Sequence, residues 1–232
     1  MNKFGRSNNF AAVLWDLDGT LIDSEPIHFK VIVDFCATHG VELSPDSYEL
    51  LIGKSDIAVC KHLNYRHGLN LTPQALWDGT KLLYAEHLHK LKCRTGVSDV
   101  VTRLYQRGIC QAVVSSSWRH FVQASLAAVG LSKYFIFTIC RDDVDYLKPH
   151  PEPYLTAANR LGVAPSQCLV VEDSHAGVQS AKRAGANVAL WAAPENPLAI
   201  KDTLELGDIS EILRCGFWKS PSSSAKSEEV AY

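Results

Sequence analysis

The chain lacks a strong excess of charge and any long apolar segment. Its 232 residues include 23 Lys and Arg against 25 Asp and Glu, so no bulk charge attracts nucleic acid or an anionic membrane surface. No apolar run suits a membrane span or a secretory signal, and the short polar N-terminus reaches a strand-like run by Phe10. We therefore expect a cytoplasmic protein without a nucleic-acid or membrane partner.

Two kinds of motif are also missing. The 7 cysteines are scattered and never occur in Cys-x-x-Cys spacing, which disfavours a zinc site and disulfides and predicts reduced, buried thiols. The chain has no Gly-x-x-x-x-Gly-Lys-[Ser/Thr] phosphate loop, so nucleoside-triphosphate switching is not expected. What remains is the composition of an ordinary globular protein, long enough for one domain plus an inserted module.

Strand-like apolar runs alternate with helical patterns over most of the chain. This alternation predicts a doubly wound parallel α/β sheet with helices on both faces. Each predicted helix is followed by a glycine that can end it, namely Gly108, Gly130, Gly162 or Gly185. The predicted strands are 10–16, 109–115, 135–140, 168–172 and 187–191, and the predicted helices are 97–107, 118–129, 151–161 and 174–184.

Residues 24–93 break this alternation. They contain no convincing strand and have the pattern of a group of helices. The breaks between these helices are expected at Gly40, Gly53, Gly68 and Pro73. We expect this block to form an all-helical domain inserted after the first strand, which leaves residues 1–23 and 94–218 as the core domain. The Ser-rich segment 219–232 is expected to be a disordered tail.

The first predicted strand ends in two aspartates two residues apart, Asp16 and Asp18. Side chains at positions i and i+2 of a strand share a face, so both carboxylates can meet at the carboxyl end of the strand, where ligands bind in open α/β sheets. Neighbouring carboxylates repel each other unless a cation or a shared proton relieves the repulsion. The pair therefore predicts Mg²⁺ binding, acid/base chemistry, or both.

Polar residues follow two further apolar runs, and a lysine stands in a loop bounded by prolines. These residues are Ser115, Ser116 and Ser117 after the run 110–114, Lys148 before Pro149 and Pro151, and Glu172 and Asp173 after the run 168–171. Together with the Asp-x-Asp-Gly-Thr segment, they resemble the four motifs of the haloacid dehalogenase (HAD) superfamily, in the expected order and over residues 10–215. The helical insertion resembles that of the group containing beta-phosphoglucomutase and phosphoglycolate phosphatase.

The resemblance implies chemistry through an aspartyl-phosphate. Asp16 is the expected nucleophile, and Asp18 is the expected general acid and base. Asp16, the backbone carbonyl of Asp18, and Asp173 are the expected ligands of Mg²⁺. Glu172 acts beside them directly or through water, because adjacent side chains cannot both point the same way from a regular strand. Lys148 is expected to neutralise charge on Asp16 and on the phosphoryl group.

The other expected site residues bind the substrate. Ser115 should hydrogen-bond a phosphoryl oxygen, as the serine of the second family motif does. His28 should reach the site from the start of the helical insertion, and Lys54 and Ser55 follow Gly53 where the family has its substrate-specificity loop. Further substrate contacts are expected from Gly19, Thr20, Ser116, Ser117 and Arg119.

The sequence therefore predicts a Mg²⁺-dependent phosphatase for a small phosphorylated metabolite, with a sugar phosphate as the first candidate, acting as a monomer or weak homodimer. A phosphomutase similar to beta-phosphoglucomutase is the main alternative. It ranks second because Asp56 replaces an arginine of the specificity loop of those mutases, and because Trp118 and Arg119 replace their Lys-Asn pair. A phospho-aspartate receiver and an inactive interaction module are alternatives of another class. The helical insertion argues against the first and the full set of motif residues against the second.

Overall fold

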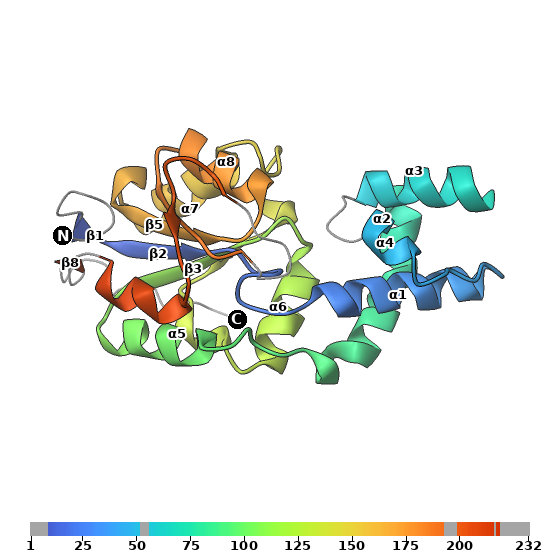
Figure 1. Ribbon diagram of the computed structural model, residues 1–232, viewed down its shortest axis with the longest axis horizontal. Coiled ribbons are helices and arrows are strands. Elements are labelled where there is room, and N and C mark those ends of the chain that lie inside the picture. The colour runs from blue at the N-terminus through green and yellow to red at the C-terminus, as the bar shows by residue number, and fades with distance from the viewer. Residues whose placement is uncertain (1–8, 52–55, 193–198, 216, 219–232) are drawn as a thin grey trace. The chain divides into compact units, whose positions relative to one another are not determined.

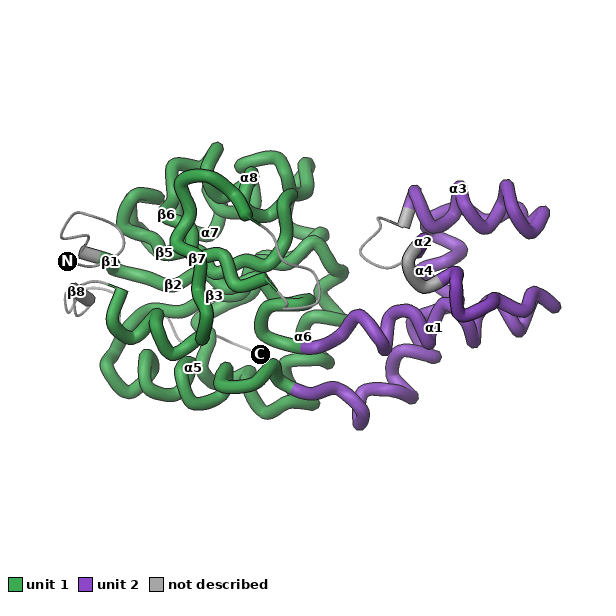
Figure 2. The backbone as a smooth tube through the Cα atoms, in the orientation of Figure 1, with its two compact units in different colours: residues 1–22, 93–232 green, residues 23–92 purple. Residues whose placement is uncertain are grey.

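The computed structural model describes residues 9–51, 56–192, 199–215 and 217–218. The chain divides into two compact units (Figure 2). Unit 1 comprises residues 1–22 and 93–232, and unit 2 comprises residues 23–92. The predicted tail, 219–232, lies outside the described residues.

Unit 1 is built on a parallel sheet of six strands in the order β4-β3-β2-β5-β6-β7. The strands are β2 (Ala12–Trp15), β3 (Cys110–Val114), β4 (Thr138–Ile139), β5 (Cys168–Glu172), β6 (Asn187–Leu190) and β7 (Leu204–Glu205). From β2 the chain winds outward to one edge and then from β5 to the other, so the predicted doubly wound parallel α/β fold is confirmed. The carboxyl ends of β2 and β5 flank the point where the winding reverses, which is where ligands bind in such sheets.

Helices cover both faces of this sheet. They are α5 (Val97–Gln106), α6 (Arg119–Ala128), α7 (Glu152–Leu161) and α8 (His175–Arg183). Figure 1 shows α7 and α8 on one face of the sheet and α5 on the other. Apolar strand residues such as Leu14 and Val170 pack with Tyr154 of α7 and Val178 of α8, and all four are buried. The glycines predicted to end the helices have positive φ angles of 67–80°, as Gly108, Gly130, Gly162 and Gly185 all show.

One predicted strand, 135–140, is too long. Only Thr138–Ile139 forms a strand, β4, and it follows the 3₁₀ helix Ser132–Tyr134. The preceding Ile136 donates its backbone N–H to Gln111 O, yet half of its side chain is exposed. An apolar run at the edge of the sheet therefore resembles a buried strand in sequence without forming a full ladder. Strand β7 was not predicted, because two residues give no periodic signal.

Two short segments of unit 1 that lie far apart in the sequence also pair with each other. A separate parallel sheet of two strands joins β1 (Asn9–Phe10) to β8 (Phe217–Trp218). Before β8, the 3₁₀ helix Ile209–Arg214 begins with a capping box formed by Asp208 and Glu211. Each of these two residues satisfies a backbone N–H that the helix start would otherwise leave without a partner.

Unit 2 is helical over its described residues. Its helices are α1 (Glu25–Thr38), α2 (Ser47–Leu51), α3 (Asp56–His67) and α4 (Pro73–His87), followed by the 3₁₀ helix Leu88–Lys90. They enclose a core of their own around Phe35, Leu63 and Leu76. A Cβ atom at Gly79 would lie 2.1 Å from the Phe35 ring, so this glycine allows α1 and α4 to approach each other closely.

Two further properties concern the whole described chain. No helix among the described residues has both the length and the hydrophobicity that crossing a membrane requires.

All seven cysteines are free, as the sequence predicts, and five of them are buried. They are Cys36, Cys60, Cys140, Cys168 and Cys215.

Candidate active site

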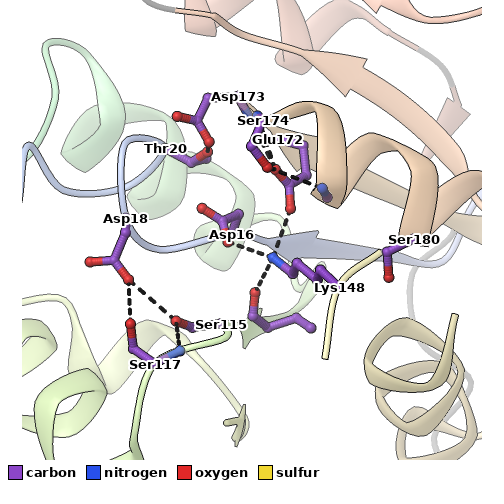
Figure 3. Close-up of polar contacts among 12 residues, drawn as sticks. Asp16, Asp18, Thr20, Ser115, Ser117, Lys148, Glu172, Asp173, Ser174 and Ser180 are labelled. Carbon is purple, nitrogen blue, oxygen red and sulfur yellow. Dashed lines mark hydrogen bonds and ion pairs between the residues drawn. The ribbon is translucent and has the colours of Figure 1, made fainter. Parts of the chain in front are cut away.

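Three carboxylates meet at the carboxyl ends of β2 and β5. Asp16 follows β2, and its backbone N–H donates to Val171 O at 3.0 Å, which continues the pairing with β5. Glu172 is the last residue of β5, and Asp173 follows it. The sheet therefore brings together residues that lie more than 150 positions apart in the sequence, at the edge where Figure 3 shows them.

Lys148 links two of these carboxylates. Its Nζ atom lies 2.5 Å from Asp16 Oδ1 and 2.7 Å from Glu172 Oε1, and it donates a third hydrogen bond to Val114 O at 2.8 Å (Figure 3). The lysine side chain is only 5% exposed. Three acceptors match the three N–H groups of an ammonium group, so the position of Lys148 is fully specified by its surroundings.

The charges of this cluster do not balance. Burial alone would lower the pKa of Lys148, but the negative charges of Asp16 and Glu172 outweigh burial and raise it, so the lysine stays protonated. The pKa of Asp16 is raised above its ordinary value, first by burial and then by Glu172 and Asp173, while Lys148 opposes this shift. Three carboxylates against one ammonium group leave an excess of negative charge, which a bound cation would relieve.

Glu172 already has partners on both of its oxygens. Oε1 accepts from Lys148 and, at 2.7 Å, from the hydroxyl of Tyr154. Oε2 accepts from the hydroxyl of Ser174 at 3.0 Å and from the backbone N–H groups of residues 173 and 174. A Cβ atom at Gly177 would lie 1.7 Å from this carboxylate, so glycine is required there. These contacts make Glu172 an anchor for Lys148.

Tyr154 is a residue of this site that was not predicted from the sequence. Its side chain is 1% exposed, and burial followed by the charge of Glu172 raises its pKa well above the usual value for tyrosine. The hydroxyl is therefore protonated and donates to Glu172. The available signal was its position in the first turn of α7, the helix that follows the lysine loop, but nothing in that spacing identifies the acceptor.

The residues present fit a magnesium ion. Asp16, Glu172 and Asp173 each offer an oxygen, and these oxygens lie within 4.8 Å of one another. Ligands of an octahedral Mg²⁺ ion are about 3 Å apart when adjacent and about 4.2 Å apart when opposite, so a bound ion would draw these oxygens closer together. Burial and the charge of Glu172 raise the pKa of Asp173 to about 7, against a hydrogen bond from Thr20 and the positive charge of Lys148. With Glu172 occupied elsewhere, Asp16 and Asp173 are the better direct ligands.

Asp18 lies across from this cluster, beside two serines that follow β3. Its Oδ2 atom accepts hydrogen bonds from Ser117 Oγ at 2.8 Å and Ser115 Oγ at 3.4 Å (Figure 3). Ser115 Oγ in turn accepts from the backbone N–H of Ser117 at 3.0 Å, and the half-buried Ser116 lies between them. The structure thus brings the predicted acid/base residue to the predicted phosphate-binding segment.

The turn after Asp18 packs against the Asp173 carboxylate. Gly19 has a φ of +78°, in the left-handed region, and a Cβ atom there would lie 2.2 Å from Asp173 Oδ2. Thr20 Oγ1 donates to Asp173 Oδ1 at 3.1 Å. Both predicted residues therefore contact the Asp173 carboxylate in this structure.

The remaining predicted residues have other surroundings. Arg119 forms an ion pair with Asp143, and its backbone N–H donates to Asp142 Oδ2 at 2.7 Å. His28 lies in the first turn of α1, with its ring 5.2 Å from that of Tyr84 in the same unit. The predicted specificity-loop residues Lys54 and Ser55 lie outside the described residues.

Comparison with known proteins identifies the family. The profile described as haloacid dehalogenase-like hydrolase matches residues 13–191. The chain belongs to the haloacid dehalogenase-like hydrolases. This confirms the predicted family and favours a hydrolase over a phospho-aspartate receiver.

Named relatives of this HAD protein include phosphatases from Escherichia coli strain K12. Phosphoglycolate phosphatase is 32% identical over 209 residues, covering 80% of this chain and 81% of the relative. The fructose-1-phosphate phosphatase YqaB is 29% identical over 180 residues, covering 76% and 93%. The solved structure of CbbY from Rhodobacter sphaeroides in complex with phosphate has a TM-score of 0.74 at 23% identity, covering 87% of this chain and 98% of that one. The relatives support the predicted enzyme class, a phosphoric monoester hydrolase, and the CbbY structure shows the fold.

Proposed function

We propose that this HAD hydrolase cleaves phosphate monoesters of small metabolites, with sugar phosphates as the first candidates, through a phosphorylated Asp16. The observation that carries the proposal is the buried Asp16 carboxylate, paired with Lys148 at 2.5 Å and lying beside Asp173. A carboxylate that lies next to a protonated lysine, at the carboxyl end of a parallel strand, suits nucleophilic attack on a phosphoryl group. The phosphatases named among the relatives support this substrate class.

The reaction has two steps. In the first, an oxygen of Asp16 attacks phosphorus and the bond from phosphorus to the ester oxygen breaks, while Asp18 gives its proton to the leaving oxygen. In the second, Asp18 takes a proton from water, the water oxygen bonds to phosphorus, and the bond to Asp16 breaks to release phosphate. Lys148 remains protonated throughout and stabilises the charge on Asp16 and on the phosphoryl oxygens.

Other side chains orient these groups. Ser117 and Ser115 hold one carboxylate oxygen of Asp18, and either hydroxyl can turn to a phosphoryl oxygen when substrate is bound. Asp16, Asp173 and the backbone carbonyl of Asp18 would hold Mg²⁺, which when bound would neutralise charge on the phosphoryl group.

The test combines substrate screening with detection of the intermediate. Phosphate release is measured with Mg²⁺ over fructose 1-phosphate, phosphoglycolate, glucose 6-phosphate and nucleoside monophosphates, with a mock purification from cells lacking the protein as the control for contaminating phosphatases. Acid quenching followed by peptide mass analysis should find a phosphoryl group on Asp16 during turnover of a good substrate. A lack of turnover over the whole panel would favour an inactive interaction module, and an Asp16→Asn variant that retains more than about a tenth of the rate would exclude Asp16 as the nucleophile.

A phosphomutase remains the second candidate and can be tested directly. A mutase must hold a second phosphate with fixed cations while the first is transferred, and Arg119, the described arginine next to the serines, is already paired with Asp143. The protein is supplied with beta-glucose 1-phosphate and a trace of the bisphosphate. We expect release of phosphate without formation of glucose 6-phosphate. Isomerisation much faster than phosphate release would reverse the order of the two candidates.

A further inference from the structure

Arg94 connects two segments of backbone at the edge of the candidate site. Its Nη1 atom donates to Gly19 O at 2.5 Å and to Trp191 O at 2.9 Å. The guanidinium carbon lies 3.6 Å from the centre of the Trp191 ring, in a stacking arrangement. The backbone N–H of Arg94 adds a bond to Leu21 O at 3.1 Å. One half-buried residue therefore contacts the Gly19 turn through both its side chain and its main chain.

The position of this turn determines the surroundings of Asp173. Gly19 lies so close to the Asp173 carboxylate that a Cβ atom would clash at 2.2 Å, and the next residue, Thr20, donates to the same carboxylate at 3.1 Å. The residue before the glycine is Asp18, whose side chain is the proposed acid and base. A shift of the turn would therefore move the contacts of Asp173 and the main chain of Asp18 together.

Trp191, the other residue that the Arg94 side chain contacts, lies at the same edge of the sheet. Trp191 follows β6, is 8% exposed, and donates its backbone N–H to Glu172 O at 2.7 Å. Arg94 thus ties the Gly19 turn to the strand beside β5, where Glu172 and Asp173 lie. One nitrogen of Arg94 donates to both carbonyls while the guanidinium plane lies against the indole ring, and an ammonium group does not reproduce this planar stacking.

We infer that Arg94 is a positioning residue for the metal site: it holds the Gly19 turn against the ends of β5 and β6, so that Asp18 and Asp173 keep the geometry that Mg²⁺ binding requires. The inference rests on the proposed Mg²⁺ site. Arg94 touches no reacting atom and acts through the backbone and through Asp173. Residues that orient metal ligands in this way typically change metal affinity by about 10- to 100-fold when they are removed.

The test compares Arg94→Met with a matched control, Arg107→Met. Arg107 also donates from its guanidinium group to a backbone carbonyl of unit 1, Leu213 O, at 3.3 Å. Neither Arg107 nor Leu213 is one of the site residues. Calorimetric titration of the metal-free proteins with Mg²⁺ gives Kd, and hydrogen exchange of the peptide 17–22 reports on the turn without metal. We expect Arg94→Met to weaken Mg²⁺ binding by about tenfold or more and to speed exchange, while Arg107→Met changes neither.

A conservative variant separates positioning from folding. Arg94→Lys keeps a positive charge, an apolar stem and an N–H donor but loses the planar group that stacks on Trp191. We therefore expect a Kd between those of the wild type and Arg94→Met, and this variant serves as the test if the Met variant does not fold. Wild-type Kd values in the variants, with measurable Mg²⁺ binding by the wild type, would overturn this inference alone. A wild-type protein that binds no Mg²⁺ would overturn the proposed metal site and the inference with it.

Discussion

The free energy of unfolding should depend on pH, the dependence should weaken when Mg²⁺ is bound, and the structure gives the magnitude. Burial and the charge of Glu172 raise the pKa of Asp173 from 3.8 to about 7 in the folded, metal-free protein. Between these values the folded state keeps a proton that the unfolded chain has released. The free energy of unfolding should therefore fall as the pH rises from about 4 through about 7. At about 1.4 kcal/mol for each pH unit, the loss from Asp173 has an upper limit of about 4 kcal/mol.

Magnesium should offset this loss, because it binds the ionised carboxylates and competes with the proton. At a free Mg²⁺ concentration of 100 times Kd, the gain is about 2.7 kcal/mol at pH 8, and it should shrink towards pH 5 as Asp173 takes up its proton. Urea unfolding followed by tryptophan fluorescence, from pH 5 to 8.5 and with either a chelator or Mg²⁺, measures both effects.

The variant Asp173→Asn isolates the contribution of one carboxylate. It cannot titrate, so the difference between the wild type and the variant removes the background from other acids and histidines. We expect this difference to fall with pH in chelator and the variant to show little stabilisation by Mg²⁺. The reasoning would be refuted by a wild-type protein that gains stability relative to the variant from pH 5 to 8 without metal, or by equal Mg²⁺ stabilisation at both ends of the range.

Three other predictions follow from the same contacts. Asp16→Asn should lower turnover by at least about a thousandfold with near-normal unfolding by urea, and appreciable residual turnover would contradict it. Activity should vanish in excess chelator and return with Mg²⁺ but not with Ca²⁺, whose longer bonds misplace the phosphoryl group; undiminished phosphate release in chelator would contradict a metal-dependent reaction. Tyr154→Phe removes a buried donor to Glu172 and should cost about 1–3 kcal/mol of unfolding free energy, so a variant as stable as the wild type would show that this hydrogen bond contributes nothing.

The central strands and the helix ends were predicted correctly because each depends on a short stretch of sequence. A buried parallel strand is a short apolar run, and a helix that ends in a left-handed residue selects glycine. The run 109–115 contains β3, the run 168–172 is β5, and Gly108 and Gly185 end the helices before β3 and β6 with positive φ angles. The preference for right-handed crossovers then determines which face of the sheet each connecting helix covers.

The edges of the sheet were harder to predict for a physical reason. Edge strands have only one neighbour and are short, so their apolar pattern covers few residues. β4 and β7 have two residues each, and the predicted strand 135–140 includes Ile136, whose side chain is half exposed. In such a segment the hydrophobic pattern reflects packing at the sheet edge as much as strand formation.

In the candidate site, the sequence predicts which carboxylates come together but not the role of each one. Spacing predicts that Asp16, Glu172 and Asp173 reach one edge of the sheet, but it cannot decide which carboxylates have room for a metal ion. That distinction depends on distant donors: Tyr154 contacts Glu172 from 18 residues away, and Arg94 reaches Gly19 across 75 residues. Since Glu172 is fully buried and has partners on both oxygens, its charge holds Lys148 while that of Asp173 can face a cation. Two adjacent acids thus acquire different chemistry from their neighbours, although their position in the motif is almost the same.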